Sequence, residues 1–539
     1  MNDASRHKIV VAGPGTGKTH LFKEVLNGKS NTLTLTFVNA LVEDLSLELC
    51  GLSDVKTLHS FARSELAKVL KKDVNLFPKL QKIVQGDAKI ILGRDIDFDH
   101  IFHNREDTNQ DIDFYKKRKD YYDHYGYSDV IFAIVKAFES KEDRIPAYEQ
   151  VVVDEFQDFN KLEVSLIELL AKKSPVLLAG DDDQALYAFK SASPDHIRQK
   201  HGDTCPEYAP FNLPFCSRCT RVIVESTNDL ITTAKQNGCL ANRIDKPYNY
   251  FEDEKKDKES DQNPKLAYTQ TYATQIPWFI QQRIGEIAKE VRGSFSVLII
   301  SPSKKQSRTI VVSWRDNGVS NIEFVEKNDS DEPSLMDGLK LLLEDGKSNL
   351  GWRIVAKFFL QEADFENLVK ESGKDGAKPL CEVIPKATKK EVQEIVKICK
   401  ATKDGKPADE AKLADVLKKV GFKPDEIVKD FLKDEITSSS ARAGNPGLRK
   451  IPIKATTIQS SKGLAADVVF ITHFDDQYFV KNKDKTKISD QDVCNFLVAL
   501  TRARRKIFLI SSDTKKEPTF LGWIDAGRIE KLSSGSRPR

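Results

Sequence analysis

Residues 8–19 read Lys-Ile-Val-Val-Ala-Gly-Pro-Gly-Thr-Gly-Lys-Thr, and they point to an α/β protein. The apolar run that ends at Ala12 predicts a buried strand, and the run that begins at Lys18 predicts a helix. A glycine-rich turn between a strand and a helix is typical of a phosphate-binding loop, because the backbone N–H groups and the helix N-terminus both face the anion. An ordinary glycine-rich turn is the alternative, but Gly-Lys-Thr in this frame has no common structural use.

The parts of this loop have different expected roles. Lys18 would reach the β- and γ-phosphates of a nucleoside triphosphate, and Thr19 would ligate Mg²⁺. The residues expected to surround the phosphate oxygens are Gly13, Gly15, Thr16 and Gly17. The sequence therefore predicts a triphosphate site that works with Mg²⁺.

A second motif, Val-Val-Val-Asp-Glu-Phe-Gln-Asp, occupies residues 151–158. The apolar residues predict a strand, and its end would place Asp154 where it can hold Mg²⁺ through water. Glu155 would then orient or deprotonate the attacking water. An Asp-Glu pair after a strand can also be a surface turn, but its occurrence behind a phosphate-binding loop favours catalysis.

Composition limits the class of protein. A chain of 539 residues is too long for one hydrophobic core, so several domains are expected. Hydrophobic residues make up 40% and charged residues 31%, which is typical of a globular protein, and no apolar run approaches the ~18–20 residues of a membrane span. The net charge of +3 does not indicate a nucleic-acid binder, so that function must be argued from local sites.

The eight cysteines are scattered along the chain, which suits a reducing compartment and predicts a cytoplasmic protein with no membrane partner. Cys216 and Cys219 have the Cys-x₂-Cys spacing of a zinc site. Such a site needs a second pair, but Cys205 and Cys239 are single and unevenly spaced, so no zinc is expected.

Strand-like apolar runs alternate with helix-like segments in two blocks, which favours parallel sheets covered on both faces. Helix-patterned segments interrupt both blocks, at residues 62–145 and 336–450. The charged segment 251–264 is expected to be a solvated surface loop.

The Asp-Glu-Phe-Gln-Asp sequence at residues 154–158 resembles the Asp-Glu-x-Gln-Asp signature of the UvrD/Rep/PcrA class of superfamily 1 helicases. Other segments are similar to the remaining motifs of that class and follow in the same order. These segments are residues 36–39, 57–61, 180–189, 213–228, 457–464 and 498–503. On this resemblance the chain is identified as a member of the family.

The resemblance implies an α/β fold with two RecA-like parallel-sheet lobes, each carrying an inserted, mainly helical subdomain. ATP would bind in the cleft between the lobes. The expected boundaries are 1–61 and 146–211 for the first lobe, 62–145 for its insertion, 212–335 and 451–525 for the second lobe, 336–450 for its reduced Lys-rich insertion, and 526–539 for a C-terminal tail.

The resemblance also implies roles at this cleft. Arg218 and Arg502 would reach the γ-phosphate from the second lobe, where their charge compensates the transferring oxygens. Gln184 would couple the γ-phosphate to nearby DNA contacts. The expected catalytic set is Lys18, Glu155, Gln184, Arg218 and Arg502, and the expected nucleotide-binding set adds His20 and Gly463 to the phosphate loop and the two arginines.

By the same resemblance, single-stranded DNA would cross the top of both lobes. Aromatic rings would stack on bases in a way that tolerates any sequence and allows sliding. The expected DNA-binding residues are Phe37, Asn39, His59, Tyr187, Phe189, Ser460 and Lys462. Core packing is the alternative for Phe37 and Phe189, and a buried, hydrogen-bonded histidine is the alternative for His59.

The chain departs from the family pattern at the base and the ribose. The Tyr that stacks on adenine is replaced by Ser217, the Arg on the opposite face by His20, and the Glu that meets the ribose by Ala465. No Gln precedes Ala12 to read the adenine edge. We therefore expect either that GTP and other nucleoside triphosphates are accepted beside ATP, or that a partner completes the base pocket. The alternative is that Phe215, His20 and backbone groups near residues 1–8 rebuild an adenine site.

Two functions from different classes follow. The first is an ATP-driven DNA helicase or translocase that moves 3′ to 5′ on single-stranded DNA, with junctions of single- and double-stranded DNA as its partners, as in DNA repair. The alternative is a nucleotide-gated accessory subunit that regulates or feeds a partner nuclease or another protein, for example in a bacterial anti-phage defence system.

Overall fold

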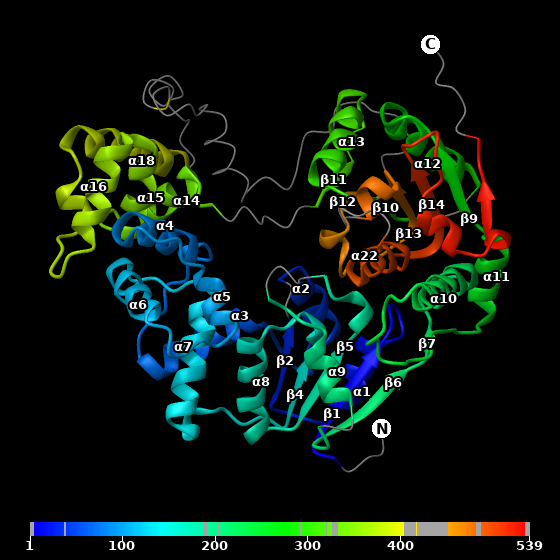
Figure 1. The fold of residues 1–539 in the computed structure, drawn as a ribbon, viewed down its shortest axis with the longest axis horizontal. Coiled ribbons are helices and arrows are strands. Elements are labelled where there is room, and N and C mark those ends of the chain that lie inside the picture. The colour runs from blue at the N-terminus through cyan, green and yellow to red at the C-terminus, as the bar shows by residue number, and fades with distance from the viewer. Residues whose placement is uncertain are drawn as a thin grey trace.

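The computed structural model describes residues 5–36, 39–186, 191–202, 205–290, 294–319, 321–325, 332–403, 417, 451–480 and 487–533. Two parallel β-sheets carry helices on both faces, and a helical insertion extends from each part (Figure 1). This arrangement confirms the predicted α/β class with two parallel-sheet lobes. No helix among the described residues has the length and apolar character that crossing a membrane requires.

The first sheet has six parallel strands in the order β3-β2-β4-β5-β1-β6. Its strands are β1 His7–Ala12, β2 Thr32–Thr36, β3 Asp54–Thr57, β4 Gln150–Val153, β5 Val176–Gly180 and β6 Tyr208–Leu213. Alternate residues face opposite sides of the sheet, so Ile9 and Val11 join one hydrophobic core and Val10 and Ala12 join another. Because both faces are covered, the central strands β4 and β5 are buried along their whole length.

Helices α1 (Lys18–Leu26) and α2 (Asn39–Glu48) cover one face of the first sheet. Helix α8 (Lys161–Lys173) and the first insertion cover the other face, while α9 (Asp195–His201) packs beside β6. The helices of the insertion are α3 Leu58–Leu70, α4 Leu80–Leu92, α5 Phe98–His103, α6 Asp111–Tyr122 and α7 Tyr127–Ser140. One continuous core joins these helices to the sheet, so the insertion is firmly attached to it.

The second sheet has seven parallel strands in the order β11-β12-β10-β13-β14-β9-β15. Its strands are β9 Leu266–Gln270, β10 Val297–Ser301, β11 Ile322–Phe324, β12 Ile453–Thr457, β13 Ala466–Thr472, β14 Ala503–Ser511 and β15 Ile529–Lys531. The helices around it are α10 Arg221–Gln236, α11 Glu254–Gln262, α12 Ile276–Glu290, α13 Lys304–Asp316, α21 Asp476–Phe479 and α22 Asp490–Leu500. A separate pair of short strands, β7 (Phe215–Cys216) and β8 (Asn249–Tyr250), lies beside α10.

The second insertion is a small helical bundle with its own hydrophobic core. Its helices are α14 Leu335–Glu344, α15 Asn349–Phe359, α16 Glu362–Ser372, α17 Leu380–Val383 and α18 Lys386–Lys403. In Figure 1 this bundle sits on α4 and α6 of the first insertion. Leu350 and Ile354 of α15 belong to the core of the first lobe, so the two insertions share buried apolar surface.

A buried ion-pair network joins the two insertions. Asp87 on α4 is fully buried and accepts hydrogen bonds from Arg118 of α6 and Arg353 of α15, each at 2.8 Å. Arg118 also donates to the backbone oxygen of Ser372 at 2.7 Å, across the same interface. Parts of the chain that lie far apart in sequence are therefore joined by charged groups that water does not reach.

Two segments differ from the prediction made from sequence. The charged stretch 251–264 is not only loop, because residues 254–262 form α11. The side chain of Asp253 caps its N-terminus, and an ion pair between Lys258 and Glu254 at 2.7 Å supports its surface. The expected C-terminal tail also contains structure, since β15 adds an edge strand beside β9.

Candidate active site

The phosphate-binding loop lies between β1 and α1, as its sequence predicts. Gly15 and Gly17 have φ of +73° and +92°, a left-handed conformation that favours glycine. The hydroxyl of Thr16 donates to the backbone oxygen of Gly13 at 2.8 Å, and Lys18 Nζ donates to the backbone oxygen of Ala12 at 3.3 Å. These bonds hold the loop in a closed curve around the start of α1.

A cavity of about 710 Å³ opens over this loop, and both lobes line it. From the first lobe it is bordered by residues 13–19, Asp44, Leu45, Leu47, Glu48, Asp154, Glu155 and Gln184. From the second part of the chain it is bordered by Ser217, Arg218, residues 296–298, Pro452, Lys454, residues 463–466, Arg502 and Arg504. The structure thus brings together, around one cavity, the predicted catalytic residues, both predicted metal ligands and the predicted nucleotide-binding residues other than His20.

Two adjacent carboxylates follow β4 and reach this cavity. Glu155 has φ of +56°, a strained conformation for a residue with a side chain, and both carboxylates are buried. Burial, together with the neighbouring Glu155, raises the pKa of Asp154. Burial acts in the same direction on Glu155, but Lys462 and Lys18 outweigh it and lower its pKa, so Glu155 is the carboxylate that stays ionised.

Thr19 and Asp154 supply hard oxygen ligands next to the phosphate loop. Mg²⁺ prefers such oxygen atoms and usually takes only one or two from the protein, with phosphate oxygens and water completing its shell. A cation beside Asp154 would also favour its ionised form, against the burial that raises its pKa. The residues present therefore fit a magnesium ion.

Lys462 lies among these carboxylates rather than on an open surface. Its ammonium group is fully buried, 2.5 Å from Asp158 Oδ2 and 3.3 Å from Glu155 Oε2. It also donates to the backbone oxygen of Gln184 at 2.9 Å. This position does not fit the expected contact of Lys462 with DNA, because its charge is already paired with Asp158 and Glu155.

A chain of hydrogen bonds runs from these carboxylates to the second lobe. Gln157 donates to Glu155 Oε2 at 2.6 Å and accepts from the backbone N–H of Asp181 at 3.0 Å. Gln184 donates to Asp181 Oδ2 at 2.6 Å and accepts from Arg502 Nη2 at 2.8 Å. Five polar side chains in the interior are thereby fixed relative to one another.

Arg502 is buried in the cavity wall with Arg218 nearby. Burial, and then the charge of Arg218, lower the pKa of Arg502 to about 10. Both effects oppose a cation at this position, and both would be relieved by an anion bound between the two guanidinium groups. The electrostatics of this wall therefore favour a phosphate group.

The strand β7 and the residues after it are docked on the phosphate loop. The backbone N–H of Ser217 donates to the backbone oxygen of Gly15 at 3.0 Å. A Cβ at Gly15 would come within 2.4 Å of Arg218 Cβ, so only glycine permits this approach. Tyr248 donates its hydroxyl to the backbone oxygen of Pro14 at 3.0 Å, and its ring lies against Gly13.

Other predicted residues have different outcomes. His20 is exposed on α1 and is not part of the cavity wall. Ser460 is buried in a short turn after β12, and His59 at the start of α3 packs its ring 4.3 Å from that of Tyr127. Phe37, Tyr187, Phe189 and the side chain of Asn39 lie outside the described residues.

The cysteine pair expected not to bind zinc lies beside the site. Cys216 and Cys219 are buried, and Cys216 Sγ lies 3.2 Å from the hydroxyl oxygen of Tyr248. Cys239 instead donates to the backbone oxygen of Ile488, and Cys205 to Glu207. Within the described ranges, the only cluster with the spacing of metal ligands is formed by three aspartates, Asp181 to Asp183.

Sequence reasoning missed three groups that shape this site: Gln157, Lys246 and Tyr248. Gln157 belongs to the Asp-Glu-Phe-Gln-Asp signature, so the sequence could have indicated that it lies at the site, although no role was predicted for it. Lys246 and Tyr248 come from the segment between α10 and β8, which carries no motif that predicts a contact with residues 13 or 181.

Comparisons with known proteins agree with this geometry. A family model described as the UvrD/REP helicase N-terminal domain matches residues 102–204, and one described as the UvrD-like helicase C-terminal domain matches residues 349–514. "DNA helicase II" of Haemophilus influenzae is 32% identical over 110 residues, covering 20% of this chain and 15% of that protein. "ATP-dependent DNA helicase PcrA" of Staphylococcus epidermidis is 25% identical over 278 residues, covering 41% of this chain and 37% of that protein.

These alignments span well under half of the length of the two relatives. A solved structure described as "The structure of PRRSV helicase" matches at a TM-score of 0.30 and 10% identity, over 95% of this chain and 53% of that chain, a likeness too low to support a conclusion. The two domain models, the two parallel sheets and the pair of carboxylates beside a phosphate-binding loop agree with one another. The chain belongs to the UvrD-like helicase family.

Proposed function

We propose that this protein is a cytoplasmic motor that hydrolyses ATP and other nucleoside triphosphates. It would use this hydrolysis to move 3′ to 5′ along single-stranded DNA and to open duplex junctions. The observation that carries the proposal is the cavity with the phosphate loop and Glu155 on one side and Arg218 and Arg502 on the other. A triphosphate bound there touches both lobes, so cleavage of its γ-phosphate changes what holds the lobes together.

The residues around the cavity divide the chemistry among them. Lys18 would release its bond to the backbone of Ala12 and turn to the β- and γ-phosphates. Thr19 and Asp154 would hold Mg²⁺, which neutralises charge on the phosphate oxygens when bound. The ionised Glu155 would orient the attacking water and accept its proton.

Arg502 and Gln184 would detect the γ-phosphate. The guanidinium of Arg502 bonds to Gln184 Oε1 at 2.8 Å, so a change at one of them reaches the other. Arg218 would add a second cation at the transferring group. Lys462 takes part by holding Glu155 and Asp158 in place rather than by gripping DNA.

We assign the DNA path to the remaining sequence candidates. Tyr187 and Phe189 follow Gln184 within five residues, which would link base stacking to the nucleotide cavity. Phe37, Asn39 and His59 stand after or beside the strands β2 and β3 of the same sheet.

The domain boundaries of the two lobes and insertions are proposed as given from the sequence, with β15 added to the second lobe.

The first experiment measures phosphate release by the purified chain with and without a single-stranded oligonucleotide. We expect stimulation by DNA, and we expect Glu155→Gln to bind nucleotide while turnover falls ~10²–10⁴-fold. Glu142→Gln is the matched control, because Glu142 is an exposed surface residue that does not line the cavity. An inactive wild-type protein, or full turnover in Glu155→Gln, would contradict the proposal.

The second experiment asks whether the chain alone unwinds a duplex with a 3′ tail. Unwinding that depends on a 3′ rather than a 5′ tail is the expected result. Stimulated hydrolysis without any unwinding would instead favour the alternative, an accessory subunit that regulates or feeds a partner nuclease.

A further inference from the structure

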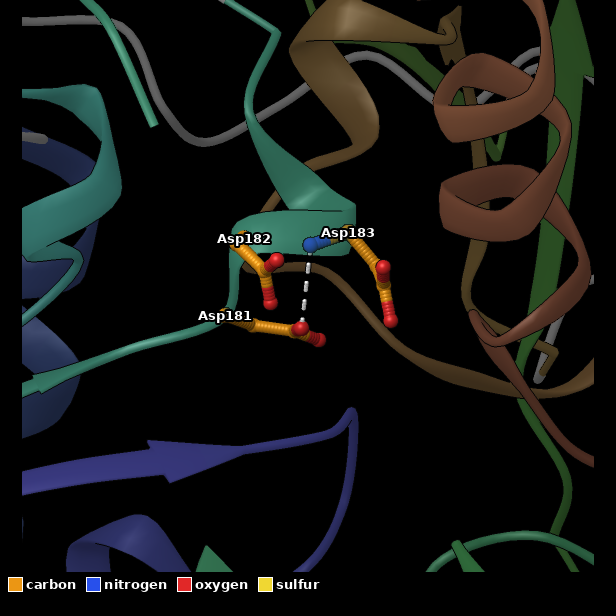
Figure 2. Close-up of side chains that lie close together, drawn as sticks. All are labelled: Asp181, Asp182 and Asp183. Atoms are coloured by element: carbon orange, nitrogen blue, oxygen red, sulfur yellow. Dashed lines mark hydrogen bonds between the residues drawn. The ribbon is translucent and has the colours of Figure 1, made fainter. Parts of the chain in front are cut away.

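Three consecutive carboxylates follow β5 and point into one small space (Figure 2). One oxygen from each of Asp181, Asp182 and Asp183 lies within 4.8 Å of the others, and all three residues are buried. Carboxylates this close repel one another and cannot all stay ionised in the interior without cations. Their spacing resembles that of a metal site, so the cation that balances them has to be identified.

The ammonium group of Lys246 occupies this space. It lies 3.0 Å from Asp181, 2.5 Å from Asp182 and 2.9 Å from Asp183, and its side chain is only 2% exposed. Arg243 pairs with Asp183 at 2.8 Å, and Arg198 pairs with Asp182 at 3.3 Å. Three side-chain cations thus balance three carboxylates, and the position at the centre of the cluster is held by a lysine.

The Asp181 carboxylate connects this lysine to the nucleotide cavity. One of its oxygens binds Lys246, and the other accepts the amide N–H of Gln184 at 2.6 Å. This bond fixes which end of the Gln184 amide faces Arg502, since the oxygen of the same amide accepts from Arg502 at 2.8 Å. An uninterrupted series of polar contacts therefore leads from Lys246 to a cation in the cavity wall.

The segment that carries Lys246 is itself attached to the site at both ends. At residue 240 its backbone N–H donates to Asp490 at the start of α22, the helix that precedes Arg502. At its other end Tyr248 donates to the backbone of the phosphate loop at Pro14. The position of Lys246 relative to Asp181 is therefore set by contacts with both parts of the nucleotide site.

We propose that Lys246 is a positioning residue for nucleotide hydrolysis, which orients Gln184 and, through it, Arg502 by holding the carboxylate of Asp181. The inference rests on the proposed function, because it assigns Gln184 and Arg502 to the γ-phosphate. A purely structural role, in which Lys246 only balances charge, makes a different prediction. Loss of any cation of the cluster would then lower kcat to a similar extent, and this decrease would be the same with and without the Gln184 side chain.

The test compares Lys246→Met with Arg198→Met. Both remove a cation from the cluster, but Arg198 binds Asp182, which makes no contact with the Gln184 side chain in the described hydrogen bonds. For Lys246→Met we expect kcat for DNA-stimulated hydrolysis to fall about 10- to 100-fold, as for loss of a charged hydrogen bond, while KM for nucleotide changes by less than about threefold. For Arg198→Met we expect both constants to stay within about threefold of wild type.

A double-mutant cycle with Gln184→Ala separates positioning from stability. In the Gln184→Ala background, Lys246→Met is expected to reduce kcat by less than about threefold further, because the group that it positions is gone. Lys246→Arg keeps a cation in the cluster and is expected to recover part of the lost kcat. An equal loss from Lys246→Met in both backgrounds, or equal losses from Lys246→Met and Arg198→Met, would overturn the proposal.

Folding and turnover are controlled separately. If Lys246→Met does not fold, Asp181→Asn takes its place in the same cycle, because it removes the ion pair to Lys246 and keeps a side chain of the same shape. If the wild-type chain has no turnover, the proposed function fails. The inference is then tested by binding, as Lys246→Met should lower the preference for a non-hydrolysable triphosphate over the diphosphate about tenfold. An unchanged preference would overturn it.

Discussion

Replacement of the buried Asp87 by Asn is predicted to loosen the interface between the two helical insertions. One oxygen of Asp87 accepts from Nε and Nη2 of Arg353, both at 2.8 Å. The other accepts from Arg118 at 2.8 Å and from the Tyr122 hydroxyl at 2.6 Å. Burial would raise the pKa of Asp87, but Arg353 and Arg118 outweigh it and lower the pKa, so this carboxylate is ionised.

The size of the effect follows from this geometry. Asn has the shape of Asp but no charge. Its amide nitrogen would replace one carboxylate oxygen, and its N–H groups would then face a guanidinium or hydroxyl group that now donates to Asp87. Two buried guanidinium groups would then lose their counter-ion, and breaking a buried ion pair in this way costs about 3–5 kcal/mol. Part of this cost would fall on the contact of Arg118 with Ser372, which crosses the interface.

Hydrogen exchange is the suitable assay, because a chain with several domains has no single free energy of unfolding. If α4 and α16 exchange through separation of the insertions, a loss of about 3 kcal/mol speeds their exchange roughly 10²-fold. Asp375→Asn is the matched control, since Asp375 is 98% exposed, its pair with Lys117 is 3.7 Å long, and surface pairs of this kind contribute about 0–1 kcal/mol. Equal protection of α4 and α16 in wild type, control and Asp87→Asn would refute the reasoning.

Three further outcomes are expected. Burial raises the pKa of Asp129 to about 7, above its unfolded value, so its contribution to stability is lost as the pH rises from about 4 to 7. The protection of α7 from hydrogen exchange in Asp129→Asn, relative to wild type, should therefore be higher at about pH 8 than at about pH 5, and an equal ratio at both would contradict this. Phe189→Ala should weaken DNA binding by ~1–3 kcal/mol per stacked base and reduce stimulation of hydrolysis more than nucleotide affinity, as measured by oligonucleotide titration and phosphate release. GTP should be hydrolysed with a kcat/KM close to that of ATP, and a preference for ATP above about a hundredfold in the isolated chain would be evidence for a complete adenine pocket.

Sequence predicted the parts of the site in which local order decides the geometry. The strand, the glycine turn and the helix over residues 8–26 follow from their own hydrophobic pattern and from backbone angles that only glycine adopts easily. The carboxylates Asp154 and Glu155 could be placed as well, because a buried strand must end where its apolar run ends. The parallel sheets follow from strands that are apolar on both faces.

Contacts between distant segments could not be predicted in the same way. The partner of Asp158 is Lys462, and nothing local distinguishes that lysine from the many exposed ones. The family resemblance placed it with DNA, whereas tertiary packing buries it among carboxylates. Lys246 is similar, because its function depends on three aspartates more than 60 residues away in sequence.

Helix α11 shows a different limit. Its residues are almost all polar, so hydrophobic periodicity gives no signal for a helix. The structure instead relies on a capping aspartate and on charge pairs one turn apart, Lys258 with Glu254 and Lys256 with Glu259. A dense run of mixed charge is therefore compatible with a short surface helix when a capping residue precedes it.

The residues that line the cavity are the basis for the expected hydrolysis of GTP beside ATP. Its walls carry backbone N–H groups and the side chains of lysine and arginine, and contacts of these groups with phosphates would be the same for every nucleoside triphosphate. Where the family places a tyrosine for adenine, Ser217 bonds to Gly15 of the loop instead, so that position serves the docking of β7. Phe215, half exposed two residues earlier, can add stacking area but no hydrogen bond to a base edge. Discrimination between bases needs a polar partner that is left unpaired by the wrong ligand, and without one we expect the affinity of this site to depend mainly on the charge of the phosphates.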